Sequence, residues 1–243
     1  MKTIFVLLAL GVSVSVLQAQ LVLDDFEDGT TQGWYVGDAG HPAPPANVAS
    51  GGPGGVNDNF LLLRSFGPGG AGSRLAVLSG AQWAGDYTAM GVTGISMDVR
   101  NFGASDLSLR LLLEDFEGMG PPANLAITSD VAVLPAGGEW TTVFFSLNVA
   151  DLVPGGLGTP AGALASVDVV RIFHNPEATF PGPGVGIPAV VAEVGVDNIT
   201  LWGTAVMTPV PEPATYAWGA ALVLGAVVAW RRRGAVRGAG ARD

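Results

Sequence analysis

Two stretches decide the fold class of this chain, ISMDVR at residues 95–100 and LSLRLLLE at residues 107–114. In the first stretch an apolar residue alternates with a polar one, and in the second Leu107, Leu109, Leu111 and Leu113 recur at every other position. This period of two is typical of a β-strand that buries one face and exposes the other. Each stretch therefore predicts a strand with one buried face.

Similar segments lie on both sides of this pair. We expect further strands near residues 21–26, 60–66, 74–79, 125–134, 140–147, 167–174 and 189–202. Glycine–proline clusters separate them, and no apolar stretch of the domain has helical spacing, although residues 148–152 suit a single turn. About nine strands with irregular loops predict an all-β fold, an antiparallel β-sandwich of the jelly-roll type.

The final strand contains a change of register. Val194 and Val196 set one apolar face, whereas Ile199 and Leu201 set the opposite one. Such a slip is typical of a β-bulge, which redirects a side chain. The alternative is that both faces are partly covered here, so that alternation carries no information.

The N-terminus has the features of an export signal. Lys2 precedes an apolar stretch from Ile4 to Leu17, and Ala19 supplies a small residue at the expected cleavage point. We expect residues 1–19 to be a signal peptide and residues 20–206 to be the jelly-roll domain.

The C-terminus has three consecutive features of a sorting segment, which we place at residues 207–243. Residues 210–214 hold two prolines around an acid, residues 214–230 form an uncharged stretch long enough for a transmembrane helix, and a basic tail follows at 231–243. The motif residues are Val210, Pro211, Glu212 and Pro213.

This arrangement resembles the PEP-CTERM sorting signal of Gram-negative bacteria. The resemblance implies an inner-membrane-anchored precursor that an exosortase, a membrane cysteine protease, cuts near the motif. It also implies a mature form at the cell surface or outside the cell, in the context of exopolysaccharide production.

The net charge of the domain excludes one class of partner, nucleic acid. Residues 20–209 contain nineteen acidic residues, five arginines and no lysine, a net charge of −14. Such a domain is repelled by phosphate backbones, so we expect no nucleic-acid partner. The chain contains no cysteine, which excludes disulfides and thiol nucleophiles.

The two ends of the domain carry a second resemblance. The opening LDDFEDG at residues 23–29, followed by Gly33-Trp34, and the closing VDNITL at residues 196–201 are similar to jelly-roll carbohydrate-binding modules. The resemblance implies a structural Ca²⁺ ion held by Glu27 and Asp197, with Asp25 as a further ligand. It also implies that sugars stack on exposed aromatic rings. The candidate rings are Trp34, Tyr35, Trp83, Tyr87 and Trp140, although large aromatic residues of a sandwich are more often part of its core.

The residues give little indication of catalysis. His41 and His174 are the two histidines, and no Gly-x-Ser-x-Gly elbow accompanies them. The acidic run from Glu114 to Glu117 fits a solvated turn better than a pair of facing catalytic carboxylates. We therefore expect a non-catalytic surface or matrix protein associated with exopolysaccharide. The alternative is a module that binds a polysaccharide directly through surface aromatics, and a polysaccharide-cleaving enzyme is the third and weakest hypothesis.

Overall fold

A computed structural model of the chain describes residues 18–37, 40–67, 72–116, 120–180 and 187–204. Residues 1–17 of the expected signal peptide and the whole of the expected sorting segment, with its motif, span and basic tail, lie outside these residues. Within them, no helix has the length and hydropathy needed to cross a membrane.

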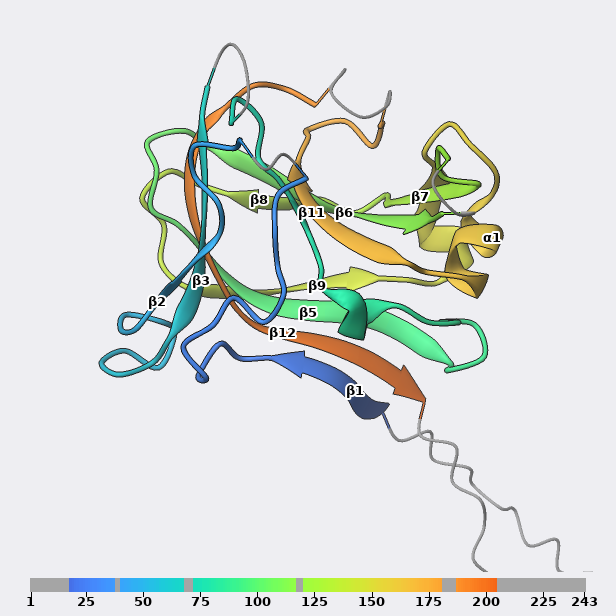
Figure 1. The fold of residues 1–243 in the computed structure, drawn as a ribbon, viewed down its shortest axis with the longest axis horizontal. Coiled ribbons are helices and arrows are strands. Elements are labelled where there is room, and N and C mark those ends of the chain that lie inside the picture. Colours follow the sequence, from blue (N-terminus) through green and yellow to red (C-terminus); the bar gives the residue numbers. More distant parts are fainter. Residues whose placement is uncertain (1–17, 38–39, 68–71, 117–119, 181–186, 205–243) are drawn as a thin grey trace, which may run out of the picture. The chain divides into compact units, whose positions relative to one another are not determined.

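The described residues form two six-stranded antiparallel sheets, stacked in two layers (Figure 1). Sheet A has the order β2 (Ala46–Val48), β3 (Phe60–Phe66), β12 (Val191–Thr204), β5 (Val92–Asn101) and β9 (Thr141–Ser146), and β1 (Gln18–Asp24) also pairs with β12. Sheet B has the order β10 (Leu152–Pro154), β7 (Asn124–Thr128), β6 (Leu107–Asp115), β11 (Val169–His174) and β4 (Ala76–Leu78), and β8 (Ala132–Leu134) also pairs with β6. This architecture confirms the predicted jelly-roll sandwich.

The core lies between the two sheets and is built by the predicted alternation. Ile95, Met97 and Val99 of β5 face Leu109 and Leu111 of β6 across the interior, and each is at most 1% exposed. A second, smaller cluster of buried side chains covers the other face of sheet B, and we call that face the outer face of sheet B. The cluster contains Leu112, Leu125, Ile127, Phe173, Phe180 and Ile187.

The structure corrects several details. The predicted strand 125–134 is two strands, β7 and β8, because a turn at Ser129–Asp130 separates them. The short strands β2 and β10 and the helix α1 (Pro160–Ala165) were not predicted, whereas the turn near 148–152 is the 3-10 helix η2 (Val149–Asp151). A second 3-10 helix, η1, spans Ala81–Trp83. The side chain of Thr159 caps α1 and Pro160 follows it, a start signal present in the sequence.

The change of register in the last strand is a real bulge. The pairing of β12 with β5 shifts between Asp197 and Thr200, and Asn198 between them has a positive φ of 49°. The bulge lets Val196 and Ile199 both face the interior although an even spacing would separate their faces. Asp197 pairs with Asp98, so its side chain lies on the opposite face of sheet A from Val196 and is only 1% exposed.

Candidate functional site

One row of cross-strand partners runs the width of sheet B and identifies which side chains share its outer face. Tyr35 pairs with Leu78 through an isolated bridge, and the row continues through both central strands to the far edge. Its members are Tyr35, Leu78, Arg171, Leu112, Ile127 and Val153. Direct partners in a sheet lie on the same face. Tyr35, which is 44% exposed, therefore stands at the β4 edge of the outer face of sheet B.

A large cavity opens on the side of sheet B that carries this row. Its volume is about 630 Å³, within the range of ligand sites. Its floor contains Arg171 of β11 and Glu114 of β6, and Phe180 and Leu125 are among its apolar walls. Prolines and glycines of the loops after β6 and β10 complete the rim; they are Gly120, Pro121, Pro122, Gly155 and Gly156.

An ion pair supplies the charge of this cavity. Arg171 donates from Nε to Oε1 of Glu114 at 2.6 Å, and its guanidinium lies 5.3 Å from the centre of the Phe180 ring. Burial raises the pKa of Glu114, and Arg171 opposes that shift. The prediction of a solvated acidic turn was wrong for Glu114, which is 2% exposed, because the loops over sheet B cover its outer face. The pair gives the cavity one anchored hydrogen-bonding group among apolar walls.

The second arginine of the outer face has a different role. Arg110 donates to five backbone carbonyl oxygens on two loops; they belong to Thr128, Ser129, Asp130, Asn175 and Pro176. Its donors are thereby used within the protein, and Arg110 is 5% exposed. We therefore assign Arg110 to loop anchoring and Arg171 to the cavity.

Trp34 and Trp83 do not offer a ring to any ligand in this structure. Both are at most 2% exposed, and both indole Nε1 atoms donate to Oδ2 of Asp24, at 2.7 and 2.6 Å. The Gln82 amide donates to the same carboxylate. Asp24 is 3% exposed, so the two rings belong to the core and satisfy a buried charge. Their assignment as sugar platforms is corrected accordingly.

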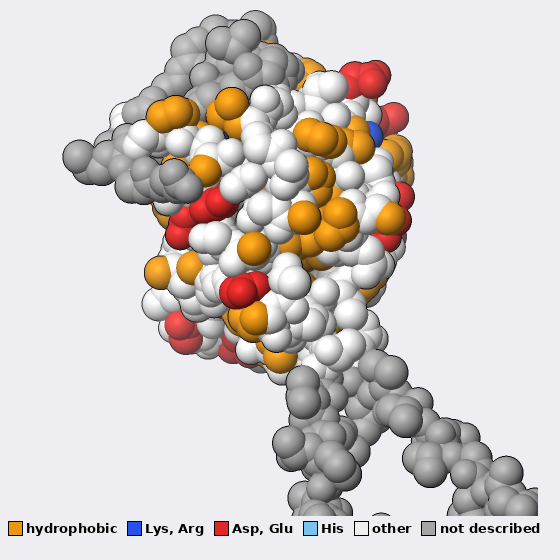
Figure 2. All heavy atoms as spheres, turned by 90° about the vertical axis from the view of Figure 1, so that its right-hand side faces the viewer, with side chains coloured by type: hydrophobic (Ala, Val, Ile, Leu, Met, Phe, Trp, Pro, Cys, Tyr) orange, Lys and Arg blue, Asp and Glu red, His pale blue; other side chains and the backbone are white. Residues whose placement is uncertain are grey.

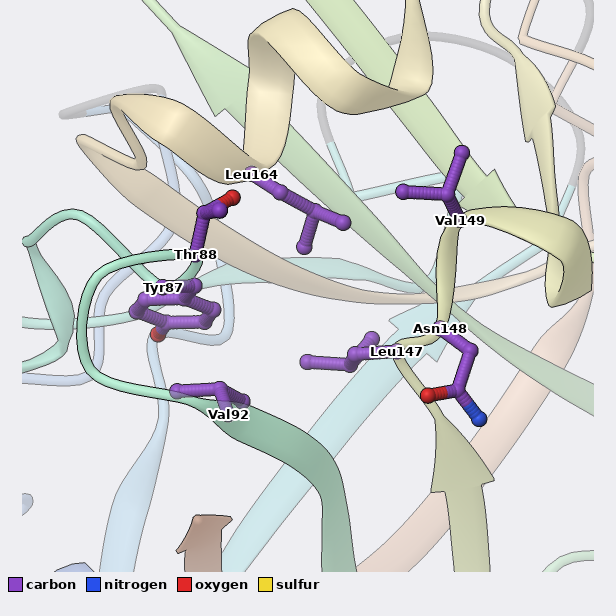
Figure 3. Close-up of a pocket in the computed structure, with 7 residues that line it drawn as sticks. All are labelled: Tyr87, Thr88, Val92, Leu147, Asn148, Val149 and Leu164. Atoms are coloured by element: carbon purple, nitrogen blue, oxygen red, sulfur yellow. The ribbon is translucent and has the colours of Figure 1, made fainter. Parts of the chain in front are cut away.

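Tyr87 is also a core residue. It is 1% exposed, its hydroxyl donates to the carbonyl of Trp83 at 2.6 Å, and burial raises its pKa. It lines a pocket of about 200 Å³ whose walls include Val92, Leu147 and Leu164 (Figure 3). This volume is below the usual range of ligand sites.

Figure 2 shows hydrophobic side chains in a band across the end of the sandwich where α1 lies.

Trp140 lies away from the large cavity. Its Nε1 donates to the Gly51 carbonyl at 3.0 Å, and its ring packs edge-on against Phe60 and Phe102, with centroids 5.4 and 6.0 Å apart. It lines a separate cavity of about 310 Å³. Of the five aromatic candidates, Tyr35 is thus the one that shares a face with the cavity of about 630 Å³.

Asp197, one of the proposed calcium ligands, lies among other acidic side chains. Burial raises the pKa of Asp197 to about 7, and the like charges of Asp58, Asp98 and Glu27 add to the shift. The four acids therefore create the negative potential that a cation would neutralise. Glu27 accepts a hydrogen bond from the Asn59 amide at 2.8 Å.

The negative charge favours a cation, but the described side chains do not provide a complete set of metal ligands. Among the described residues, no three acidic or histidine side chains come close enough together to hold one metal ion. Asp25 accepts hydrogen bonds from the Glu27 amide and the Gln32 side chain, and its charge does not contribute to the shift at Asp197. Backbone carbonyls and water would have to supply part of the shell, which calcium permits.

Sequence analysis missed the residues of the cavity itself. Arg171 occupies an outward position of a predicted strand, which gives no sign that loops cover it. Phe180 and Leu157 lie in loops between strands, where no periodicity exists to place a side chain. The proline-rich rim at 120–122 was visible only as a turn signal.

The sequence matches no protein-family model and no curated protein. Among solved structures, an exo-β-agarase aligns with 75% of this chain over 25% of its own length, at 12% identity and a TM-score of 0.52. The family 11 carbohydrate-binding module from Clostridium thermocellum, solved with a β-1,3-1,4-mixed-linked tetrasaccharide, aligns over 77% of this chain and 96% of its own, at 17% identity and a TM-score of 0.49. The family 22 xylan-binding domain from Paenibacillus barcinonensis aligns over 79% and 97%, at 14% identity and a TM-score of 0.44.

Together with the strand order, the likeness to the exo-β-agarase defines the class as a jelly-roll β-sandwich. At 12% identity it shows the fold alone.

Proposed function

We propose that this chain is the precursor of an exported, non-catalytic protein whose jelly-roll domain binds a polysaccharide on the outer face of sheet B. The observation that carries the proposal is the cavity of about 630 Å³ on that side, with an exposed tyrosine on the same face. Apolar walls with a few fixed polar groups suit a sugar ring, which has apolar faces and a polar edge.

The chemistry of the cavity favours a neutral polymer and binding without cleavage. A domain with a net charge of −14 repels acidic polysaccharides. Glu114 is the one carboxylate among the described lining residues, and it is paired with Arg171. Hydrolysis of a glycosidic bond requires two facing carboxylates, so we assign the pair to orientation of sugar hydroxyls.

Export rests on the two terminal segments. The apolar segment before Ala19 would direct secretion, and residues 210–213 followed by the uncharged stretch 214–230 and the basic tail would direct sorting by an exosortase. We place the precursor in the inner membrane and the mature domain at the cell surface or in the extracellular matrix. Intact-mass measurement of the protein from its native host should give a form that starts at Gln20 and lacks residues 214–243.

A structural Ca²⁺ ion is part of the same proposal. Glu27 and Asp197 would supply carboxylate oxygens, with Asp25 as an additional ligand. Support comes from the position of Asp197, a buried carboxyl that faces three further acids. The ion would join β1 and β12, the first and last strands of the domain, in a chain without disulfides.

Binding can be tested on the exported protein by affinity electrophoresis against neutral glucans, xylans and galactans. We expect Tyr35→Ala to weaken binding about tenfold, or roughly 1.4 kcal/mol, without a change in melting temperature. Arg171→Met should also weaken binding. Phe144→Ala is the matched control, because Phe144 is 50% exposed but lies on sheet A. Equal effects of the Tyr35 and Phe144 substitutions would reject the site.

A further inference from the structure

Sheet A also has an outer face, and one half of it is apolar. A row of direct partners crosses this half from β1 to β9, and its members are Leu23, Thr200, Ser96 and Phe144. The interior is filled by their neighbours Ile199, Ile95 and Phe145, each at most 1% exposed. Leu23 and Phe144 therefore point away from the core, and they are 39% and 50% exposed.

A second row lies closer to the ends of β1 and β12. Its members are Gln20, Trp202, Gly94 and Ser146. The indole Nε1 of Trp202 donates to the Ser96 hydroxyl at 2.8 Å, which fixes the ring across the sheet. The Phe144 ring covers Gly94, the direct partner of Trp202. We call the surface formed by Leu23, Phe144 and Trp202 the Trp202 face.

The Trp202 face contains no charge. None of the residues in the two rows is ionisable, although the domain as a whole is strongly acidic. The two ion pairs of sheet A, Arg64 with Glu193 and Arg100 with Glu139, lie in its other half. Two acids border the face: Asp98 follows Ser96 on the same side of β5, and Asp151 accepts a hydrogen bond from the Ser146 hydroxyl at 2.6 Å. A surface with a fixed tryptophan, an exposed leucine and an exposed phenylalanine, bordered by polar groups, suits the headgroup boundary of a lipid bilayer.

The domain is tethered at this same surface. Gln20, the first residue after the expected cleavage point, is the direct partner of Trp202, so β1 and β12 bring the start and the end of the domain side by side (Figure 1). Nine residues, 205–213, separate Thr204 from Ala214, where the proposed span begins. Nine residues reach at most about 30 Å. While the span is in the membrane, the Trp202 face is thus held within about one bilayer thickness of the lipid surface.

We propose that, in the anchored precursor, the Trp202 face rests on the surface of the bilayer. This inference rests on the membrane anchor of the proposed function. The docked domain presents the outer face of sheet A to lipid, so that the cavity of sheet B, on the opposite side of the sandwich, opens away from the membrane. The contact favours zwitterionic lipid, because the acidic domain is repelled by an anionic surface.

The absence of cysteine makes a direct test simple, because one introduced thiol is the only one in the chain. The signal-processed full-length protein is inserted into phosphatidylcholine nanodiscs that contain lipid with a nitroxide on its headgroup. A small fluorophore is attached at Leu23→Cys in one variant and at Val133→Cys in the other. Val133 is the matched control: it is 64% exposed and pairs with Ser108, on the outer face of sheet B.

We expect the label at position 23 to be quenched several-fold more than the label at position 133. Adding Phe144→Gln to the first variant should reduce the quenching, whereas adding Val133→Gln should leave it unchanged. If the protein inserts and both labels are quenched equally, docking is rejected while the anchor stands. Failure of the chain to enter the nanodiscs would instead reject the membrane anchor, and docking with it.

Discussion

Two buried carboxyl groups near the first strand differ in the groups that surround them, and this difference decides how each is stabilised. Asp24 at the end of β1 is 3% exposed, and Asp197 at the bulge of β12 is 1% exposed. Asp24 receives hydrogen bonds from two indoles and an amide. Asp197 receives hydrogen bonds from Asn198 and is surrounded by three further acids. The comparison indicates that Asp24 is satisfied within the chain, whereas Asp197 is stabilised by a proton or a cation.

Removal of Asp24 should have the largest effect. Asp24→Ala leaves the indole N–H groups of Trp34 and Trp83 and the Gln82 amide without their buried acceptor. We expect a loss of about 3–5 kcal/mol in the free energy of unfolding, since each unsatisfied donor costs about 1–3 kcal/mol. Urea unfolding measures it. Asp25→Ala is the control, because Asp25 is only half-buried. Similar losses in both variants would contradict the special role of Asp24.

The second largest effect is a pH dependence of the free energy of unfolding, whose direction follows from the raised pKa of Asp197. Its folded-state pKa of about 7 exceeds its ordinary value of 3.8, so between these values the folded protein binds more protons than the unfolded one. In the presence of chelator, the contribution of Asp197 to stability should therefore fall as pH rises from about 4 to 7, by a few kcal/mol.

The variant Asp197→Asn isolates this contribution, because an amide does not titrate. The difference in unfolding free energy between wild type and variant, followed by urea titration at several pH values, should change across this window. A constant difference would show that Asp197 does not carry a raised pKa. Glu114, whose pKa is also raised by burial, is present in both proteins and cancels from the difference.

Bound calcium should offset the loss of stability that ionisation of Asp197 causes in the folded protein. An ion present at a hundred times its dissociation constant adds about 2.7 kcal/mol to stability. For a domain of this size that corresponds to roughly 5–10 °C in melting temperature. Glu27→Gln should remove the shift, whereas Asp28→Asn, at the next and equally exposed position, should retain it. A melting temperature that is the same in calcium and in chelator, with metal removal verified by mass spectrometry, would reject the ion.

The smallest effect is expected at Asp25. Its carboxylate is engaged by the Glu27 amide and the Gln32 side chain, and it does not contribute to the potential at Asp197. Asp25→Asn should therefore lower the calcium-dependent shift by less than about 1 kcal/mol, the scale of one ordinary hydrogen bond. A loss as large as that of Glu27→Gln would make Asp25 a full ligand and would extend the site along β1.

The sequence by itself predicted the sandwich and most of its strands. Alternation in β5 and β6 predicted which of their residues form the core, and the slip at Asp197 predicted the bulge, because a period of two depends only on local backbone geometry. The terminal segments likewise gave the expectation of export and anchoring, since length, hydropathy and charge are properties of the chain alone.

Only the tertiary structure decided which outward positions are open. Trp34 and Tyr35 are neighbours on opposite faces, but alternation does not predict that Trp34 meets Asp24 in the core while Tyr35 is exposed on the outer face of sheet B. Alternation places Glu114 at an outward position, but it does not predict that loops over sheet B bury this side chain. Those outcomes depend on loops and strands far away in the sequence, whose packing over a face is fixed by the whole fold.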